Sequence, residues 1–164
     1  ECVQIVKGLY ETDKSVPGYL LAGSIYGPSY ISFEYAMSYY GLIPEAVYTV
    51  TSATFEKKKK KRYETPFGTF TYCDVPAEAF PLELILVQEG DYFYRIASPE
   101  KAVCDKLYTM SPTANIKELY ALLADDLRID MDALKKLDQS KLAQLSGKYH
   151  STNVKKLCSL IRRL

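Results

Sequence analysis

Residues 30–45 constrain the fold most, because this segment carries both the start and the stop of a helix. Ser32 can cap the first turn with its hydroxyl, and Glu34 places a negative charge where the helix dipole favours one. Gly41 suits a left-handed C-cap, and Pro44 prevents the helix from continuing. One face is apolar at helical spacing, as is typical of a helix packed on a sheet, and consists of Phe33, Ala36, Met37 and Tyr40.

Strand patterns follow this helix. β-Branched and aromatic residues alternate over residues 47–55 and 63–75, which predicts a hairpin with a lysine run at its tip. Pro66 and Gly68 interrupt the second segment, which indicates a bulge, an edge position or a break into two strands. Residues 83–88 and 92–97 flank Glu89-Gly90-Asp91, a typical hairpin turn. We therefore expect an α+β fold with a small, mostly antiparallel or mixed sheet and a packed N-terminal helix.

The C-terminal third is predicted to be helical. Ser98 precedes Pro99 in the order that suits an N-cap and a first helical residue. Ser151 or Thr152 can cap the last helix, whose apolar residues recur at helical spacing. We expect an α/β core over 25–112 and a C-terminal helical subdomain over 113–164, with helices at 116–127, 132–137, 141–145 and after 152.

The cysteine content and the hydropathy of the chain limit the classes of protein to which it can belong. The four cysteines are widely spaced and the chain has one histidine, so we expect no zinc set and no cofactor. Cys104 and Cys158 fall on apolar helical faces, where reduced thiols are typical. No apolar run reaches the roughly 20 residues of a membrane span, and we expect no signal peptide. These features predict a cytoplasmic protein that does not contact a membrane.

Positive charge is concentrated in one run. The net charge is +1, but residues 57–62 hold six of the 21 basic residues, which leaves 15 basic against 20 acidic elsewhere. The run can be a solvated tip that protects a sheet edge, or it can hold phosphates without reading bases. The candidate nucleic-acid contacts are Lys7, Lys57, Lys58, Lys59, Lys60, Lys61 and Arg62.

Fifteen tyrosines and no tryptophan are present, and many tyrosines crowd the first helix and its flanks. A tyrosine buries its ring while its hydroxyl stays wet. This composition suits either the rim of a small core or a surface that contacts a partner.

Four segments, in the same order, resemble signatures of the AbiEi family, the antitoxin and transcriptional-regulator half of type IV toxin–antitoxin systems. The first is residues 30–45, Y-I-S-F-E-Y-A-M-S-Y-Y-G-L-I-P-E. The second is residues 49–54, T-V-T-S-A-T. The third is residues 65–72, T-P-F-G-T-F-T-Y, and the fourth is residues 96–105, I-A-S-P-E-K-A-V-C-D.

The resemblance implies a domain order and partners. Lys7-Gly8-Leu9-Tyr10 is similar to the last wing strand of the family's N-terminal winged helix. It implies that residues 1–24 are the remnant of that wing and a linker, and that most of the winged helix is missing. The implied partners are operator DNA, bound through the missing domain, and a cognate nucleotidyltransferase-like toxin. Antitoxins of this type generally act without a stable toxin complex.

The segment after Ser98 has two interpretations. In the first, Glu100 is simply an acidic residue in the first turn of a capped helix. Lys101 and Asp105 are four residues apart and can form an ion pair on the helix surface. Alternatively, these residues form a polar patch that contacts an anionic group. Because the family's neutralising activity resides in this domain, the resemblance makes the following residues candidates for it: Glu34, Ser98, Glu100, Lys101 and Asp105.

Catalytic motifs are missing from the sequence. Lys101 follows Glu100 directly, so these two residues do not spell the D/E-x-K core of many nucleases, and no P-loop or nucleophile elbow occurs. His150 is the only histidine that could act as a base. We therefore expect a protein that is not an enzyme. A degenerate nuclease stays open as an alternative, and a metal-dependent activity lost in Glu100→Gln would support it.

Overall fold

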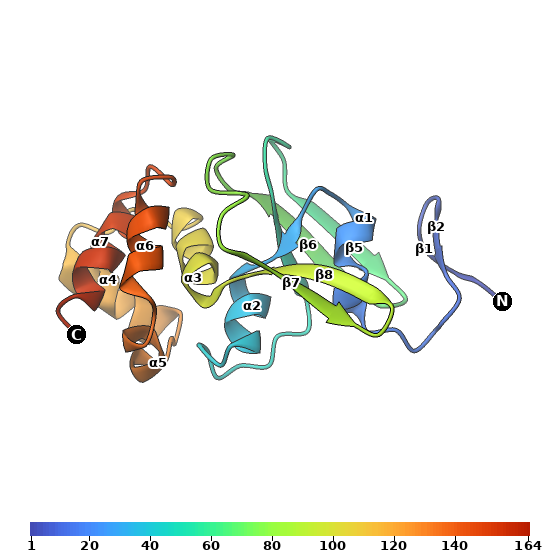
Figure 1. Cartoon of the computed structure of the whole chain (residues 1–164), viewed down its shortest axis with the longest axis horizontal. Helices are drawn as coiled ribbons and strands as arrows, with labels where there is room; N and C mark the ends of the chain where they lie inside the picture. Colours follow the sequence, from blue (N-terminus) through green and yellow to red (C-terminus); the bar gives the residue numbers. More distant parts are fainter.

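A six-stranded mixed sheet forms the centre of the molecule (Figure 1). The structure is a computed structural model that describes residues 1–164. The strands lie in the order β5-β6-β4-β3-β8-β7, and helices flank the sheet. This confirms the predicted α+β fold. The strands are β3 (Tyr30–Ile31), β4 (Val50–Thr54), β5 (Lys61–Thr65), β6 (Gly68–Asp74), β7 (Leu84–Glu89) and β8 (Tyr92–Ala97).

The pairing of strands differs from the prediction at the lysine run. β4 runs parallel to β6, and β5 pairs with β6 in an antiparallel hairpin at the sheet edge. The hairpin turn is therefore at Pro66-Phe67, where Thr65 Oγ1 accepts from the backbone N–H of Phe67 at 3.0 Å and donates to the Gly68 carbonyl at 2.9 Å. The prediction that the lysine run forms a hairpin tip is wrong: residues 57–60 connect β4 to β5. The predicted β7–β8 hairpin is confirmed.

Helix α2 (Phe33–Tyr39) ends as predicted, with Gly41 at φ +72°. Phe33, Ala36 and Met37 are buried, which confirms the apolar face. The predicted cap is wrong, because the Ser32 side chain makes no capping hydrogen bond. Its hydroxyl donates instead to a carboxylate on another helix, an interaction that local sequence does not reveal.

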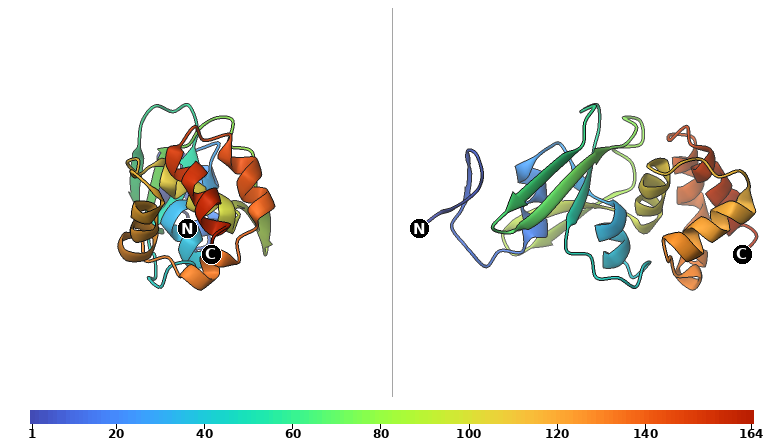
Figure 2. Two further views of the ribbon diagram at one scale, coloured as in Figure 1. Left: turned by 90° about the vertical axis from the view of Figure 1, so that its left-hand side faces the viewer. Right: turned by 180° about the vertical axis from the view of Figure 1, so that it is seen from behind.

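The C-terminal helices gather at one end of the molecule, away from the N-terminus (Figure 2). Helix α3 (Pro99–Tyr108) begins as predicted, and the Ser98 hydroxyl accepts from the backbone N–H of Lys101 at 3.2 Å. Ser151 caps the last helix. The helices after α3 are α4 (Ile116–Ala121), which continues into the π-helical turn η2 (Leu122–Asp126), α5 (Met131–Lys135), α6 (Gln139–Ser146) and α7 (Thr152–Ile161).

The N-terminal residues form a two-stranded hairpin, β1 (Val3–Val6) and β2 (Leu9–Glu11), at the opposite end. Gly8 adopts φ +85°, and the chain turns there. The 3-10 turn η1 (Gly18–Leu20) and the short helix α1 (Ala22–Ile25) follow. The Tyr72 hydroxyl donates to the Ala22 carbonyl at 2.5 Å and fixes α1 against the sheet.

No helix has both the length and the apolar character that a bilayer crossing requires. All four cysteines are free thiols, and Cys104 and Cys158 are buried as predicted. His150 is exposed.

Candidate functional site

Asp105 of α3 is the centre of a buried polar cluster. Its side chain is fully buried. Oδ2 accepts from the hydroxyls of Tyr30, at 2.7 Å, and Ser32, at 2.6 Å. Oδ1 accepts from the Tyr149 hydroxyl at 2.5 Å. Three donors compensate the carboxylate for the water it has lost. We call Tyr30, Ser32, Lys101, Asp105 and Tyr149 the Asp105 cluster.

Lys101 lies one helical turn before Asp105 and is also fully buried. Its ammonium donates to the Ala79 carbonyl, and it lies 3.5 Å from the Tyr149 hydroxyl. The rings of Tyr30 and Tyr149 flank the ammonium at 5.2 and 5.7 Å. The prediction of a surface pair between Lys101 and Asp105 is wrong, because α2, α6 and α7 cover α3. Tyr149 joins the two charged groups instead.

Burial dominates the electrostatics of the cluster. It raises the pKa of Asp105, although the Lys101 charge and the three hydroxyl donors oppose that shift. Burial lowers the pKa of Lys101, and the Asp105 charge opposes it. The pKa values of Tyr30 and Tyr149 are raised well above 10, first by burial and then by Asp105, so both hydroxyls remain donors at neutral pH. A cluster sealed in this way fixes β3, α2, α3 and the start of α7 relative to one another.

The five predicted patch residues do not form one exposed patch. Ser98 is a buried cap, and Glu100 is buried 3.9 Å from the Lys141 ammonium. Burial raises the pKa of Glu100, while Lys141 opposes the shift. Glu34 is partly exposed and pairs with Lys106. Of the five, only Lys101 and Asp105 have side chains in the Asp105 cluster, which lies in the interior, and the Ser98 side chain hydrogen-bonds only to the Lys101 backbone.

The four AbiEi-like segments are neighbours in the fold. The first forms β3 and α2, and the second forms β4, which pairs with β3. The Thr51 hydroxyl of β4 donates to the Ser32 carbonyl at 2.6 Å and accepts from the Tyr35 backbone N–H at 3.0 Å. The third segment enters β6, which pairs with β4, with Thr51 opposite Thr71. The fourth joins β8 to α3 and supplies Asp105. The four segments therefore build one continuous unit.

Part of the lysine run borders a hollow of about 380 Å³, which is lined by residues of strands β4, β5 and β6 and of helices α2 and α3. We call this the basic hollow; its cations are Lys60, Lys61, Arg62 and Lys106. Glu34 is its one acidic residue and pairs with Lys106. The hollow therefore carries a net positive charge and favours an anion.

The other predicted basic residues lie elsewhere. Lys57 donates to the Gly27 carbonyl at 3.1 Å and packs over the Tyr26 ring at 5.1 Å. The backbone N–H of Lys58 donates to the Asp74 carboxylate at 2.7 Å. Lys7 is at the turn of the β1–β2 hairpin. The run is thus divided between residues 57–59, which lie outside the hollow, and residues 60–62, which line it.

Sequence reasoning missed Tyr30, Tyr149 and Lys106 as site residues. Lys106 follows the predicted residue Asp105 in the chain and pairs with the predicted residue Glu34. An expectation that α2 packs against α3 would have suggested this ion pair. Tyr149 lies 44 residues from Asp105, in the segment before α7, and no local pattern connects the two.

No three histidine, cysteine, aspartate or glutamate side chains lie close enough together to hold a metal ion. In comparisons with known proteins, no protein-family model, curated protein or solved structure matches the chain.

Proposed function

We propose that this chain is the toxin-neutralising part of a type IV antitoxin that also represses its own operon. In this proposal the chain is cytoplasmic and acts without catalysis. Its counterpart is a cognate nucleotidyltransferase-like toxin, and operator DNA is bound by an N-terminal winged helix. The observation that carries the proposal is the set of four AbiEi-like segments, which occur in family order and pack side by side around β4 and Asp105.

A growth assay tests this proposal. The toxin is the nucleotidyltransferase-like reading frame next to this gene, expressed from an inducible promoter. Co-expression of the present chain is expected to restore part of the growth, and a form extended through the winged helix is expected to restore more. An adjacent region without such a toxin gene, or no rescue by either form at matched protein levels, contradicts the proposal.

A second candidate function is binding of nucleic-acid phosphates in the basic hollow. The observation that favours it is the convergence of three cations from the lysine run with Lys106 of α3 around one concavity. Lysine and arginine side chains supply sequence-independent affinity by neutralising phosphates. The hollow therefore favours contact with a nucleic-acid backbone over base reading.

The two halves of the run provide a matched test. Replacing Lys60, Lys61 and Arg62 with Ser is expected to abolish salt-sensitive binding of a labelled DNA duplex, measured by fluorescence anisotropy. Replacing Lys57, Lys58 and Lys59 with Ser removes the same charge outside the hollow and is expected to retain most of the binding. In the native chain, log affinity is expected to fall with log salt by about 0.9 for each phosphate neutralised. Equal losses in both variants, or no binding by the native chain, contradict this second function.

A further inference from the structure

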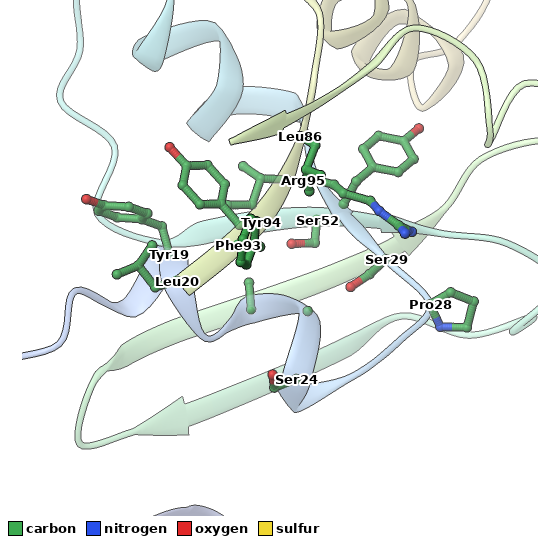
Figure 3. Close-up of a pocket in the computed structure, with 14 residues that line it drawn as sticks. Tyr19, Leu20, Ser24, Pro28, Ser29, Ser52, Leu86, Phe93, Tyr94 and Arg95 are labelled. Carbon is green, nitrogen blue, oxygen red and sulfur yellow. The ribbon is translucent and has the colours of Figure 1, made fainter. Parts of the chain in front are cut away.

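A second hollow, of about 310 Å³, lies against η1, α1 and the strands β3, β4, β7 and β8 (Figure 3). Thr51 points from β4 towards α2, so the next residue, Ser52, points to the opposite face of the sheet. The hollow therefore occupies the face opposite the main part of the basic hollow. We call it the serine pocket, and its lining includes Ser24, Ser29, Ser52, Leu86, Phe93 and Arg95.

Ser52 carries a buried hydroxyl without a partner. The residue is 1% exposed, and its Oγ is the one buried side-chain oxygen or nitrogen in the chain that makes no hydrogen bond. In Figure 3 this hydroxyl points into the space between Tyr94 and Ser29. A buried hydroxyl without a partner destabilises the folded protein, because it has lost its hydrogen bonds to water without replacing them. The other buried polar side chains are satisfied, so this one donor is available to a molecule in the pocket.

Arg95 gives the pocket its charge. The residue is exposed, no carboxylate lies within ion-pair distance of it, and no acidic residue lines the pocket. Figure 3 shows its guanidinium extending on the side of Ser29 and Pro28. A planar guanidinium with free donors matches a carboxylate, which it can bind through two parallel hydrogen bonds. The Ser29 hydroxyl already donates to the Tyr26 carbonyl at 2.7 Å. One cation and the remaining serine hydroxyls, those of Ser24 and Ser52, suit a monoanion better than a doubly charged phosphate.

The wall of the pocket is apolar at the β7–β8 hairpin. Leu86 pairs with Arg95 across the hairpin, and Phe93 precedes Arg95 by two residues, so all three side chains share one face. Leu86 is 65% exposed and Phe93 is 59% exposed. Exposed apolar side chains beside a free cation can cover the body of a small amphipathic molecule. The volume lies at the lower end of the range for small-molecule sites, about 300–1,000 Å³.

We propose that the serine pocket binds a small organic acid. Its oxygen atoms accept from the Arg95 guanidinium and the Ser52 hydroxyl, and its apolar body lies against Leu86 and Phe93. The serine pocket shares Tyr30 with the Asp105 cluster and Ser52 with the basic hollow, whereas Arg95, Leu86 and Phe93 line the serine pocket alone. It does not depend on the proposed antitoxin function, because binding is measured on the purified chain and neutralisation is measured in cells.

Calorimetry and ligand-observed NMR with phenylacetate, indole-3-acetate and 4-methylvalerate test the proposal. At least one of these acids is expected to bind saturably at millimolar concentration or below. The neutral analogue of each acid, its amide, is expected to bind at least about tenfold more weakly than the acid, because it lacks the charge that pairs with Arg95. No saturable binding by any of the three acids, or equal binding of acid and amide, overturns the proposal.

Two variants locate the site. Arg95→Gln is expected to weaken binding roughly 10- to 100-fold, because a hydrogen bond to a charged group is lost. Arg62→Gln, an exposed arginine of the basic hollow, is the matched control and is expected to leave binding unchanged. Equal weakening by both substitutions overturns the proposal, because it places the ligand outside the serine pocket.

Ser52→Ala is expected to weaken binding several-fold while the free protein unfolds at the same or a higher urea concentration, because the unpartnered hydroxyl is gone. If the alanine variant does not fold, Ser52→Cys is measured in its place, because a thiol has a similar size to the hydroxyl but is a weaker hydrogen-bond donor. Undiminished binding in the folded variant overturns the assignment of Ser52.

Discussion

The hydroxyl oxygen of Tyr149 lies 2.5 Å from Oδ1 of Asp105, although 44 residues separate the two in the chain. The same hydroxyl lies 3.5 Å from the Lys101 ammonium. Tyr149 therefore joins a buried carboxylate to a buried ammonium and ties the segment before α7 to α3. Sealed in this way, the Asp105 cluster stabilises the domain, and any surface that contacts a partner must lie elsewhere.

Tyr149→Phe tests this connection. The substitution keeps the ring but removes one donor to Asp105 and one acceptor for Lys101, so the free energy of unfolding is expected to fall by about 1–3 kcal/mol. Urea unfolding followed by circular dichroism measures the change. Tyr108→Phe, at a half-exposed tyrosine whose ring lies beside Tyr149, is the control and is expected to change stability by less than about 0.5 kcal/mol. Equal stability of the two variants contradicts the role given to Tyr149.

Asp105→Ala is expected to be more damaging. It leaves the hydroxyls of Tyr30 and Ser32 without their acceptor and removes the charge opposite Lys101, so the expected loss is about 3–5 kcal/mol. The exposed Asp126, changed to Ala, serves as the control in the same unfolding experiment. A loss below about 1 kcal/mol for Asp105→Ala is incompatible with a satisfied, sealed cluster.

Glu100 predicts a pH dependence. Burial raises its folded-state pKa above the ordinary value of 4.5. Folding therefore favours the protonated form of Glu100. The contribution of this residue to the free energy of unfolding is fully present below pH 4.5 and is lost as pH rises through the folded-state pKa. Glu100→Gln, which stays neutral, is expected to gain stability relative to the native chain as pH rises from 4 to 7. Urea unfolding at several pH values measures this difference, and a stability difference that stays constant or shrinks over this range contradicts the burial argument.

Gly41 tests the helix stop. Its φ of +72° is left-handed, and a Cβ built there meets nothing within 4 Å, so strain is the only cost of a side chain. Gly41→Ala is expected to lower the free energy of unfolding by about 1 kcal/mol. Gly147→Ala, at a glycine with φ −75° and similarly open space, is expected to be neutral or slightly stabilising. Thermal unfolding of both variants compares them directly, and equal melting temperatures would refute the strain.

Local signals in the sequence predicted much of the fold. Gly41, Ser98-Pro99 and Glu89-Gly90-Asp91 each fix the backbone within a few residues, and the structure has the helix stop, helix start and hairpin at these positions. Helices α5 and α6 begin slightly earlier than predicted because Asp130 and Asp138 cap them with their carboxylates. These caps are local signals that could have been recognised.

Interactions between distant residues could not be predicted in this way. Ser32 has the composition of a cap, but its hydroxyl is drawn to Asp105, 73 residues away. The spacing of Lys101 and Asp105 suits a surface pair equally well, and only the packing of α6 and α7 decides that the pair is buried. The pairing of β4 with β6 likewise depends on the whole sheet, whereas the pattern of residues 47–75 fits a simple hairpin as well.

Survival after toxin induction measures whether this chain neutralises a toxin. Cells that carry a nucleotidyltransferase-like gene from the region next to this one are plated with an empty vector, with the present chain, or with a form extended through the proposed winged helix. We expect more colonies with the present chain than with the empty vector, and more still with the extended form. Equal colony numbers in all three, at confirmed expression of both proteins, would contradict this expectation.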